Sequence, residues 1–594
     1  MPSKIAVEDP ESCIVHRAPS NSESRSAQRG DSDHRSNLDG SSHELSAAIA
    51  VTPSAIARRF GAREAALLAV AVLVIAWMVL RWPVPEVMLN SHDWVHQLGG
   101  ANQILHGEHP FIDWRTDYGP LRYYPSALAQ RRFGPRTLAE LLLTTAAYAI
   151  AYVLLFHLLW VASGRRLVAA ALLVVALLLA PQLDKYYVVL GPVVCLWAAW
   201  RCIDRPTAAA LMVLAAAVVV TGLFRADFGA FVGLAAVVAI ATGPDGARER
   251  AGRLLCFATV AMLLVVPWLL WLTLHGGLAG YFVDTFLVAP QHASAMSRPF
   301  PRFAPPLQDP RNALFLLFVA VFLVPPLTFI VALRPGAVAD PNERRRILTA
   351  VVLAQAVLVH ASHRSDFSHL QQAMPVCFVL CAWLAGRAMA HRRAASRVGI
   401  GLVGLAGAAL LCAAARMGQR PSSHVGTWLM MARLHALPRA AMVAELAARH
   451  PDDTWLQAIQ YVRRCTATDD RIVALPPHIG AYYFADRRFA GGQPAWSPGF
   501  FSGPADQRRW IDTVRRQGVA LVLGDAFHIV AGQPERLFAN YSPLITEYVT
   551  TQFMPIGAFG RIGVRAPGVA SLRNDGVPPC IRAAAGEESS GAPP

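Results

Sequence analysis

The sequence predicts a polytopic α-helical membrane protein that carries a small α/β domain after its last membrane span. Its 594 residues are 54% hydrophobic and only 16% charged, and their mean hydropathy is +0.37. This composition is too apolar for a string of ordinary soluble domains. The apolar residues are gathered in long runs, whereas the C-terminal part of the chain alternates amphipathic and short buried segments.

The two ends of the chain lack hydrophobic periodicity. Residues 1–60 are rich in Ser, Arg, Asp and His, and residues 569–594 are rich in Gly, Pro and Ser. Segments of this kind bury too little apolar surface to fold. We therefore expect a disordered cytoplasmic tail before the first span and a second disordered tail after the α/β domain.

A transmembrane domain is expected over residues 61–418, with about eleven runs able to cross, or nearly cross, a hydrocarbon core of ~30 Å. The short runs near 167–242 come as hairpins, so one misjudged hairpin changes the count by two and preserves its parity. The runs are 65–82, 138–161, 167–181, 186–201, 207–223, 228–242, 253–275, 312–333, 347–361, 371–390 and 398–415.

Loop arginines predict the orientation, because basic residues are retained on the cytoplasmic side. They are concentrated before the first span and in every second loop after it, so we expect a cytoplasmic N-terminus and an extracytoplasmic C-terminal domain in the cell inner (plasma) membrane. These arginines are Arg58, Arg59, Arg63, Arg165, Arg166, Arg201, Arg205, Arg248, Arg250, Arg253, Arg334, Arg344, Arg345, Arg346, Arg387, Arg392, Arg393 and Arg397.

The extracytoplasmic domain is expected over residues 419–568. Residues 424–450 have a helical pattern, and further on helices alternate with short buried strands, which is typical of an α/β domain. The expected helices are 454–464 and 504–517, and the expected strands are 471–476, 519–524 and 559–565.

The most unusual polar segments of the chain fall on the predicted external side. The longest is the loop 83–137, whose stretch SHDWVHQLGGANQILHGEHPFIDWRTDYGPLRYY (91–124) combines acids, histidines and aromatic residues. LDKYY, FRADFG and HASHRSDFSH occur in other loops of the same side. Their clustering predicts an active site at the external membrane surface. The formal net charge of +15 does not indicate nucleic-acid binding, because the arginines are scattered between apolar runs.

Asp93 is the first candidate for a catalytic group, as a general base near the headgroup plane. The structural alternative is an N-cap, because Ser91 and Asp93 precede an expected helix that Gly107 would end. His92 and His96 have the i, i+4 spacing of a zinc-binding helix, although aspartate stands where the HExxH motif has glutamate. A membrane zinc hydrolase is therefore a further alternative.

Three basic residues are candidates for binding a phosphate, namely Arg225, Arg364 and Lys185. A guanidinium offers planar bidentate bonds to phosphate oxygens, and a lysine offers a point charge. The alternative is charge balance with an aspartate that lies within two residues of each. His369 could bind the phosphate or orient the carboxylate of Asp366 in the substrate pocket, and the alternative is an interfacial histidine with satisfied hydrogen bonds.

The first external loop offers two further carboxylates, Asp113 and Asp117. They are candidate catalytic groups, and the alternative is that they cap turns before Tyr118-Gly119-Pro120. The segment from Tyr118 to Tyr124 is expected to shape a substrate pocket.

The first external loop resembles that of the GT-C superfamily of multi-span glycosyltransferases, which use polyprenyl-phosphate-linked sugars. The chain is similar to bacterial protein mannosyltransferases and to the transferases that add aminoarabinose or galacturonic acid to lipid A. The resemblance extends to RADFG, to the R-x-D-x-x-H pattern of residues 364–369 and to residues 469–492 of the C-terminal domain. One departure is Trp94, where mannosyltransferase-like members often have glutamate. Within the first external loop, the resemblance to the GT-C superfamily rests on Asp93, Ala101, Ile104, Leu105, Gly107, Pro110, Asp113, Asp117, Tyr118-Gly119-Pro120, Tyr124 and Phe133-Gly134.

The resemblance implies a GT-C-like fold and an inverting transfer of a sugar from a polyprenyl phosphate to an external lipid, glycan or protein. It implies that Asp93 is the general base. Membrane lipids are the other expected partners, and no nucleic acid is expected. No cofactor or bound metal is implied, although a divalent metal is left open. The main alternative is a flippase or transporter of a polyprenyl-linked glycan.

Overall fold

The computed structural model of the chain describes residues 69–70, 72–76, 92–178, 185–305, 310–390, 425–476, 478–524 and 534–568, all of which belong to the unit Phe60–Pro594. The predicted tails at 1–60 and 569–594, the predicted span 398–415 and most of the span 65–82 lie outside these residues.

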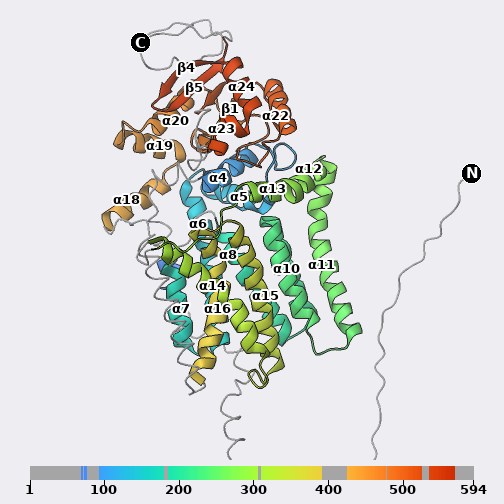
Figure 1. Cartoon of the computed structure of the whole chain (residues 1–594). Coiled ribbons are helices and arrows are strands. Elements are labelled where there is room, and N and C mark those ends of the chain that lie inside the picture. Colours follow the sequence, from blue (N-terminus) through green and yellow to red (C-terminus); the bar gives the residue numbers. More distant parts are fainter. Residues whose placement is uncertain are drawn as a thin grey trace, which may run out of the picture. The chain divides into compact units, whose positions relative to one another are not determined.

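Long apolar helices dominate the described part of the chain (Figure 1). Six of them are long and apolar enough to cross a membrane, and three shorter apolar helices accompany them, so the chain is a multi-pass membrane protein. The prediction of about eleven spans is therefore confirmed in part. The six are α6 (Thr137–Ser163), α8 (Tyr186–Asp204), α11 (Ala247–Leu274), α14 (Pro310–Leu333), α15 (Pro341–His363) and α16 (Phe367–Ala390), and the shorter three are α7 (Arg166–Leu178), α9 (Ala208–Phe224) and α10 (Ala226–Ala241).

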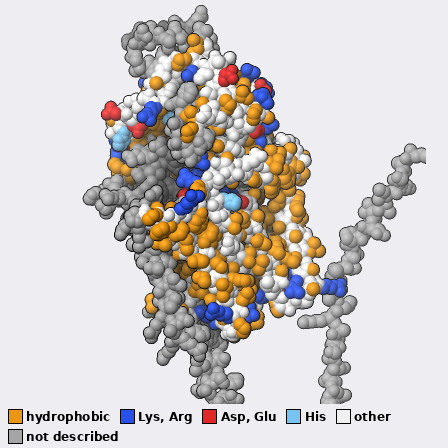
Figure 2. Space-filling view, viewed as in Figure 1, with side chains coloured by type: hydrophobic (Ala, Val, Ile, Leu, Met, Phe, Trp, Pro, Cys, Tyr) orange, Lys and Arg blue, Asp and Glu red, His pale blue; other side chains and the backbone are white. Residues whose placement is uncertain are grey.

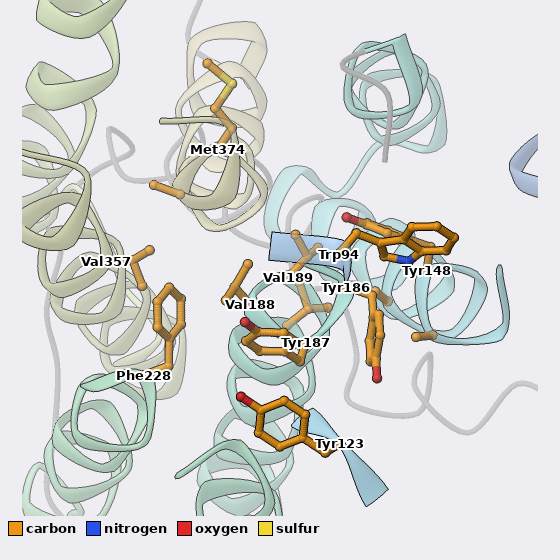
Figure 3. Close-up of a cluster of buried hydrophobic side chains, with 14 of the residues drawn as sticks. Trp94, Tyr123, Tyr148, Tyr186, Tyr187, Val188, Val189, Phe228, Val357 and Met374 are labelled. Atoms are coloured by element: carbon orange, nitrogen blue, oxygen red, sulfur yellow. The ribbon is translucent and has the colours of Figure 1, made fainter. Parts of the chain in front are cut away.

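The helices differ in how much of their surface faces other helices. The apolar window of α8 is 72% buried and that of α11 is 6% buried. Helix α8 therefore lies inside the bundle, whereas α11 exposes almost its whole apolar surface, as expected of a helix that faces lipid. Figure 3 shows Tyr187 and Val188 of α8 among the buried side chains of the bundle core, with Phe228 and Val357 near them.

Basic residues gather at the end of the helices opposite the C-terminal region (Figure 2). Arg346, in the first turns of α15, lies 3.3 Å from Asp204 at the end of α8. Arg253 of α11 lies 2.6 Å from Asp245 in the loop before that helix. These loops are the ones that the distribution of arginine predicts to be cytoplasmic.

The segment between the first spans forms helix α4 (His92–Leu105), the short helix η2 (Pro120–Arg122) and helix α5 (Tyr124–Phe133). Helix α4 ends as predicted, because Gly107 adopts a φ of +82° that glycine tolerates without steric cost. Between α11 and α14, the chain forms α12 (Leu278–Val283), a π-helical turn η3 (Asp284–Val288) and α13 (Ala289–Ala295).

The C-terminal region is a mixed sheet flanked by helices. Its strand order is β2-β1-β3-β5-β4 among the described residues. Strand β1 is parallel to β2 and β3, while β5 is antiparallel to β3 and β4. The strands are β1 (Arg471–Ala474), β2 (Arg488–Phe489), β3 (Leu521–Leu523), β4 (Phe553–Phe559) and β5 (Ile562–Pro567), and the helices are α18 (Val425–Ala436), α19 (Arg439–Arg449), α20 (Thr454–Cys465), η4 (His478–Gly480), α21 (Ala481–Phe484), α22 (Pro504–Gln517), η5 (Pro534–Arg536), α23 (Phe538–Tyr541) and α24 (Pro543–Gln552).

The predicted elements of this region need two corrections. Pro438 divides the helix expected over 424–450 into α18 and α19, because proline cannot donate a backbone hydrogen bond. The strand expected over 559–565 begins later, at Ile562 of β5, because Phe559 ends β4 and Gly560 (φ +56°) lies in the turn that joins the two strands. Asp453 caps α20 by accepting hydrogen bonds from the backbone N–H groups of residues 455 and 456.

The first external segment is joined to the C-terminal region by buried polar contacts. Arg439 donates to the Oδ1 of Asn102 at 2.7 Å and forms an ion pair with Asp486. Glu108 forms an ion pair with Arg471 of β1. Buried bonds of this kind tie two segments far apart in sequence, so the sheet region holds α4 in place.

Candidate active site

The Tyr118-Gly119-Pro120 turn lies against the end of helix α9. The backbone N–H of Gly119 donates to the carbonyl oxygen of Phe224 at 3.1 Å. A Cβ at residue 119 would stand 2.0 Å from the carbonyl oxygen of Leu223. Glycine is therefore required here for close backbone approach, and the turn is brought next to Arg225.

Three basic side chains lie around the ring of Tyr118. The guanidinium of Arg122, which is fully buried, lies 3.6 Å from the ring centroid. Lys185 and Arg225 approach the same ring at 5.6 Å and 5.7 Å. Cations over an aromatic face are stabilised by its negative quadrupole. The ring thus gathers basic groups from three separate segments.

Arg122 is held by α8 as well as by the turn. Its Nη1 donates to the hydroxyl of Tyr187 at 2.9 Å, and the Tyr187 ring stacks on Phe224 with centroids 5.3 Å apart. Figure 3 shows Tyr187 beside Tyr123 in this buried aromatic group. The surrounding aromatic residues fix the position of the arginine, because long cationic side chains lose their rotamer freedom when they pack.

Arg225 has the carboxylate partner that the charge-balance alternative expects. Its Nε donates to Asp227 at 2.8 Å, and the other oxygen of Asp227 lies 3.4 Å from Nδ1 of His360. Among the described residues, this carboxylate is bonded to the Nε edge of Arg225, which leaves the two Nη groups for another anion.

The loop between α15 and α16 forms a second charged group. Asp366 accepts a hydrogen bond from Nδ1 of His369 at 2.7 Å, and it lies 3.6 Å from Arg364 and 3.8 Å from Arg298. Burial alone would raise the pKa of Asp366, but the bond from His369 and the charge of Arg364 lower it below its usual range. The two arginines lie side by side, because the backbone N–H of Arg298 donates to the carbonyl oxygen of His363 at 2.9 Å.

The two charged groups meet through their histidines. The rings of His360 and His369 lie with centroids 5.6 Å apart. Arg225, Arg364 and His369 are therefore in one continuous arrangement, as the clustering of polar loops predicts. The sequence candidate Lys185 approaches it from the start of α8, beside Tyr118.

Asp117 is partly buried at the edge of the site and contacts a different helix. Its Oδ2 lies 2.8 Å from Nδ1 of His292 in α13, and Nε2 of His292 lies 2.9 Å from the hydroxyl of Ser497. Burial alone would raise the pKa of Asp117, but the hydrogen bond and charge of His292, together with Arg122, lower it. Asp117 is thus held as a carboxylate.

Asp113 and Tyr124, two other candidates from the sequence, make their side-chain hydrogen bonds away from the Tyr118 ring. Asp113 is exposed and accepts a hydrogen bond from the backbone N–H of His109 at 2.7 Å, which is the turn-capping role given as its alternative. The hydroxyl of Tyr124 lies 3.0 Å from Nδ1 of His109, and its ring is near Trp268 of α11. Among the described residues, neither side chain contacts Tyr118 or the three basic residues around its ring.

The side chains of His92 and Asp93 lie outside the described residues. The described part of α4 places His96 in the site, with its ring edge-on to Tyr118 at 6.1 Å and to Tyr123 at 5.8 Å. The start of α4 is therefore next to the aromatic turn. No three His, Cys, Asp or Glu side chains within the described ranges form a group that could hold a metal ion.

The sequence does not assign the roles of Arg122, His292 and Arg298. Arg122 lies in the first external loop, and its position between a proline and two tyrosines is a usable signal. His292 and Arg298 lie in a loop in which no motif singles them out. Neither pairing could be found from spacing, because the partners of His292 are 175 and 205 positions away in the sequence.

Chemically, the arrangement suits an anion at the end of apolar helices. Arginine Nη groups and a lysine ammonium are strong donors to phosphate oxygens, and their contacts strengthen where water is excluded. Carboxylates at the rim provide proton acceptors, as a transfer to a hydroxyl requires.

Comparison with known proteins gives likenesses to solved structures. No family model and no curated protein matches the chain. ArnT from Cupriavidus metallidurans bound to undecaprenyl phosphate is similar, with a TM-score of 0.49 and 14% identity over 86% of this chain and 98% of that one. The apo state of ArnT gives a TM-score of 0.45, 14% identity and coverages of 85% and 98%.

The Archaeoglobus fulgidus oligosaccharyltransferase, tethered to an acceptor peptide with an NVT sequon, is also similar. Its TM-score is 0.45, with 11% identity over 86% of this chain and 74% of that one. The chain is thus similar in structure to ArnT and to this oligosaccharyltransferase. With TM-scores below 0.5, these likenesses carry no argument about the chemistry of this chain.

Proposed function

We propose that this chain is an inverting glycosyltransferase that moves a sugar from a polyprenyl phosphate to an extracytoplasmic lipid, glycan or protein. The observation that supports it best is the gathering of Arg122, Lys185 and Arg225 around Tyr118. A lipid-linked donor needs cations for its phosphate beside apolar helices for its tail. The sheet region and this site are assigned to the outer face of the inner membrane, and residues 1–60 to the cytoplasm.

In the proposed reaction, the acceptor hydroxyl loses its proton to a carboxylate and its oxygen attacks the anomeric carbon of the sugar. The bond from that carbon to the phosphate oxygen breaks, and polyprenyl phosphate leaves with its electron pair. Arg225 and its neighbours stabilise the negative charge that grows on the phosphate. Asp93 is assigned as the base because the sequence resemblance implies it, and Asp117 is the described carboxylate nearest to Tyr118 in the chain.

The test is sugar transfer in liposomes that contain the purified chain, a panel of polyprenyl-phosphate sugars and envelope acceptors. Replacing Arg225 by Gln removes charge-assisted bonds worth about 1.5–3 kcal/mol, so the donor KM should rise roughly 10- to 100-fold. The matched control is Arg248→Gln, an exposed arginine in the first turn of α11, which should leave the KM unchanged.

Asp93→Asn should abolish turnover and leave membrane insertion intact. Retained turnover in that variant would remove Asp93 as the base. Release of free polyprenyl phosphate in step with sugar transfer separates the transferase from a flippase, which moves its glycan unchanged. An inert wild type with every donor would refute the proposed function.

A further inference from the structure

His292 stands between two parts of the molecule that are distant in sequence. It lies on α13, yet its ring nitrogens reach Asp117 of the first external segment at 2.8 Å and Ser497 of the C-terminal region at 2.9 Å. Its ring also packs on Phe500 with centroids 5.0 Å apart. One imidazole therefore joins three segments at the edge of the site.

The two hydrogen bonds place a proton on Nδ1 of the ring. An ionised Asp117 can only accept, so Nδ1 of His292 must carry a proton and donate it. Nε2 accepts from the hydroxyl of Ser497 in the neutral ring and donates to the same oxygen in the imidazolium, because a hydroxyl can do either. The opposite tautomer would direct a lone pair at the carboxylate, so the pair fixes both the tautomer and the ring orientation.

Helix α13 is itself held firmly against the C-terminal region. A Cβ at Gly499 would stand 2.7 Å from the carbonyl oxygen of Gln291 and from Cβ of Ala295. Arg536 donates to the carbonyl oxygen of Ala295 at 3.4 Å. This close backbone contact makes α13 a rigid support for the His292 ring.

The preceding turns of the same segment have a different environment. Phe282, Phe286 and Leu287 are exposed, and the rings of Phe282 and Phe286 stack with centroids 5.8 Å apart. Exposed apolar side chains next to a lipid-facing helix are typical of a segment that lies at the membrane surface. His292 thus belongs to an element supported on one side by the sheet region and exposed on the other.

We propose that His292 is a positioning residue for donor binding, which rests on the proposed function. It holds Asp117, and Asp117 precedes the Tyr118 around which Arg122, Lys185 and Arg225 are arranged. Losing the Asp117 contact would let the Tyr118 turn shift, and misplacement by about 1 Å in a binding site can cost on the order of 100-fold.

The test uses two variants of His292, to Asn and to Gln, whose side-chain amide nitrogens each replace one ring nitrogen of the histidine. In His292→Asn, the amide nitrogen can replace Nδ1 and still donate to Asp117. In His292→Gln, it reaches toward the position of Nε2 and the bond to Asp117 is lost. We expect a donor KM roughly 10-fold higher in His292→Gln, an unchanged acceptor KM and a rescue of most of the loss in His292→Asn. His275→Gln, at the exposed end of α11, is the matched control.

A purely structural role gives a different result. The active fraction and the thermal midpoint would then fall in both variants, with no change in donor KM, and this would overturn the proposal. Combining Ser497→Ala with His292→Gln should add little, because both remove the same chain of hydrogen bonds.

Hydrogen exchange of residues 115–122 needs no turnover, so it separates this proposal from the proposed function. Loss of amide protection in His292→Gln and its retention in His292→Asn would support the positioning role even if no donor were active. Equal protection in wild type and both variants would refute it.

Discussion

Replacing Gly119 by Ala tests whether the Tyr118 turn must lie directly on the end of α9. The added Cβ would stand 2.0 Å from the carbonyl oxygen of Leu223 and 2.6 Å from its carbonyl carbon. These are backbone atoms, which cannot rotate away. Ordinary contact begins at 3.4 Å, so relief of the clash needs a displacement of about 1 Å or more.

Two energetic terms follow from this displacement. Overpacking in a well-packed region typically costs about 1–3 kcal/mol, and loss of the bond from Gly119 to Phe224 costs about 1 kcal/mol. We therefore expect the free energy of unfolding to fall by about 2–4 kcal/mol. Tyr118 would move with the turn, so the rate of sugar transfer should fall by about 100-fold.

The assay is thermal unfolding in detergent together with the initial rate of transfer in liposomes. Gly252→Ala is the matched control, because it lies within α11 and a Cβ there meets nothing within 4 Å. Alanine in a helix interior should stabilise this control slightly. If Gly119→Ala had the thermal midpoint and the rate of the wild type, the proposed docking of the turn would be wrong.

Two further predictions concern buried charges in the external segments. Burial raises the pKa of Asp284 to about 6 in spite of its bonds to Arg115, so its ionisation lowers the stability of the fold as pH rises from about 4 to 6, by up to about 3 kcal/mol; the unfolding midpoint should rise as pH falls from 6 toward 4, with no contribution from this group above about pH 6, and Asp284→Asn should flatten this change. Burial alone would raise the pKa of Asp486, but its bond to His106 and the charge of Arg439 lower it to about 2, so its stabilisation is present above about pH 4 and is lost as pH falls toward 2. Arg439→Ala should lower the free energy of unfolding by about 3 kcal/mol, measured by chemical denaturation, and a change below about 1 kcal/mol would contradict the buried ion pair.

The apolar helices could be predicted closely because hydrophobicity is a local property of the sequence. Nine of the eleven expected runs correspond to described helices, and α14 begins two residues before its predicted run and ends with it. The lengths of the helices between residues 167 and 242 were harder to predict. Helices α8, α9 and α10 pack on one another, and a helix buried inside a bundle need not have the length that the hydrocarbon core imposes.

The site could be predicted as far as its polar loops. Arg225, Arg364 and His369 were expected on one side of the membrane, and the structure brings them together through Asp227 and Asp366. The same reasoning could not tell Asp113 from Asp117, because both precede the same turn. Only packing exposes Asp113 and partly buries Asp117 against His292.

Hydropathy and its periodicity can be read residue by residue, so they suffice to predict a helical membrane protein with polar residues in its loops and a C-terminal sheet region. Three contacts arise only on folding: Arg122 lies over Tyr118, His292 joins Asp117 to Ser497, and the sheet region supports α4. These contacts join residues that no local pattern relates, and their energies depend on burial that exists only after the chain has folded.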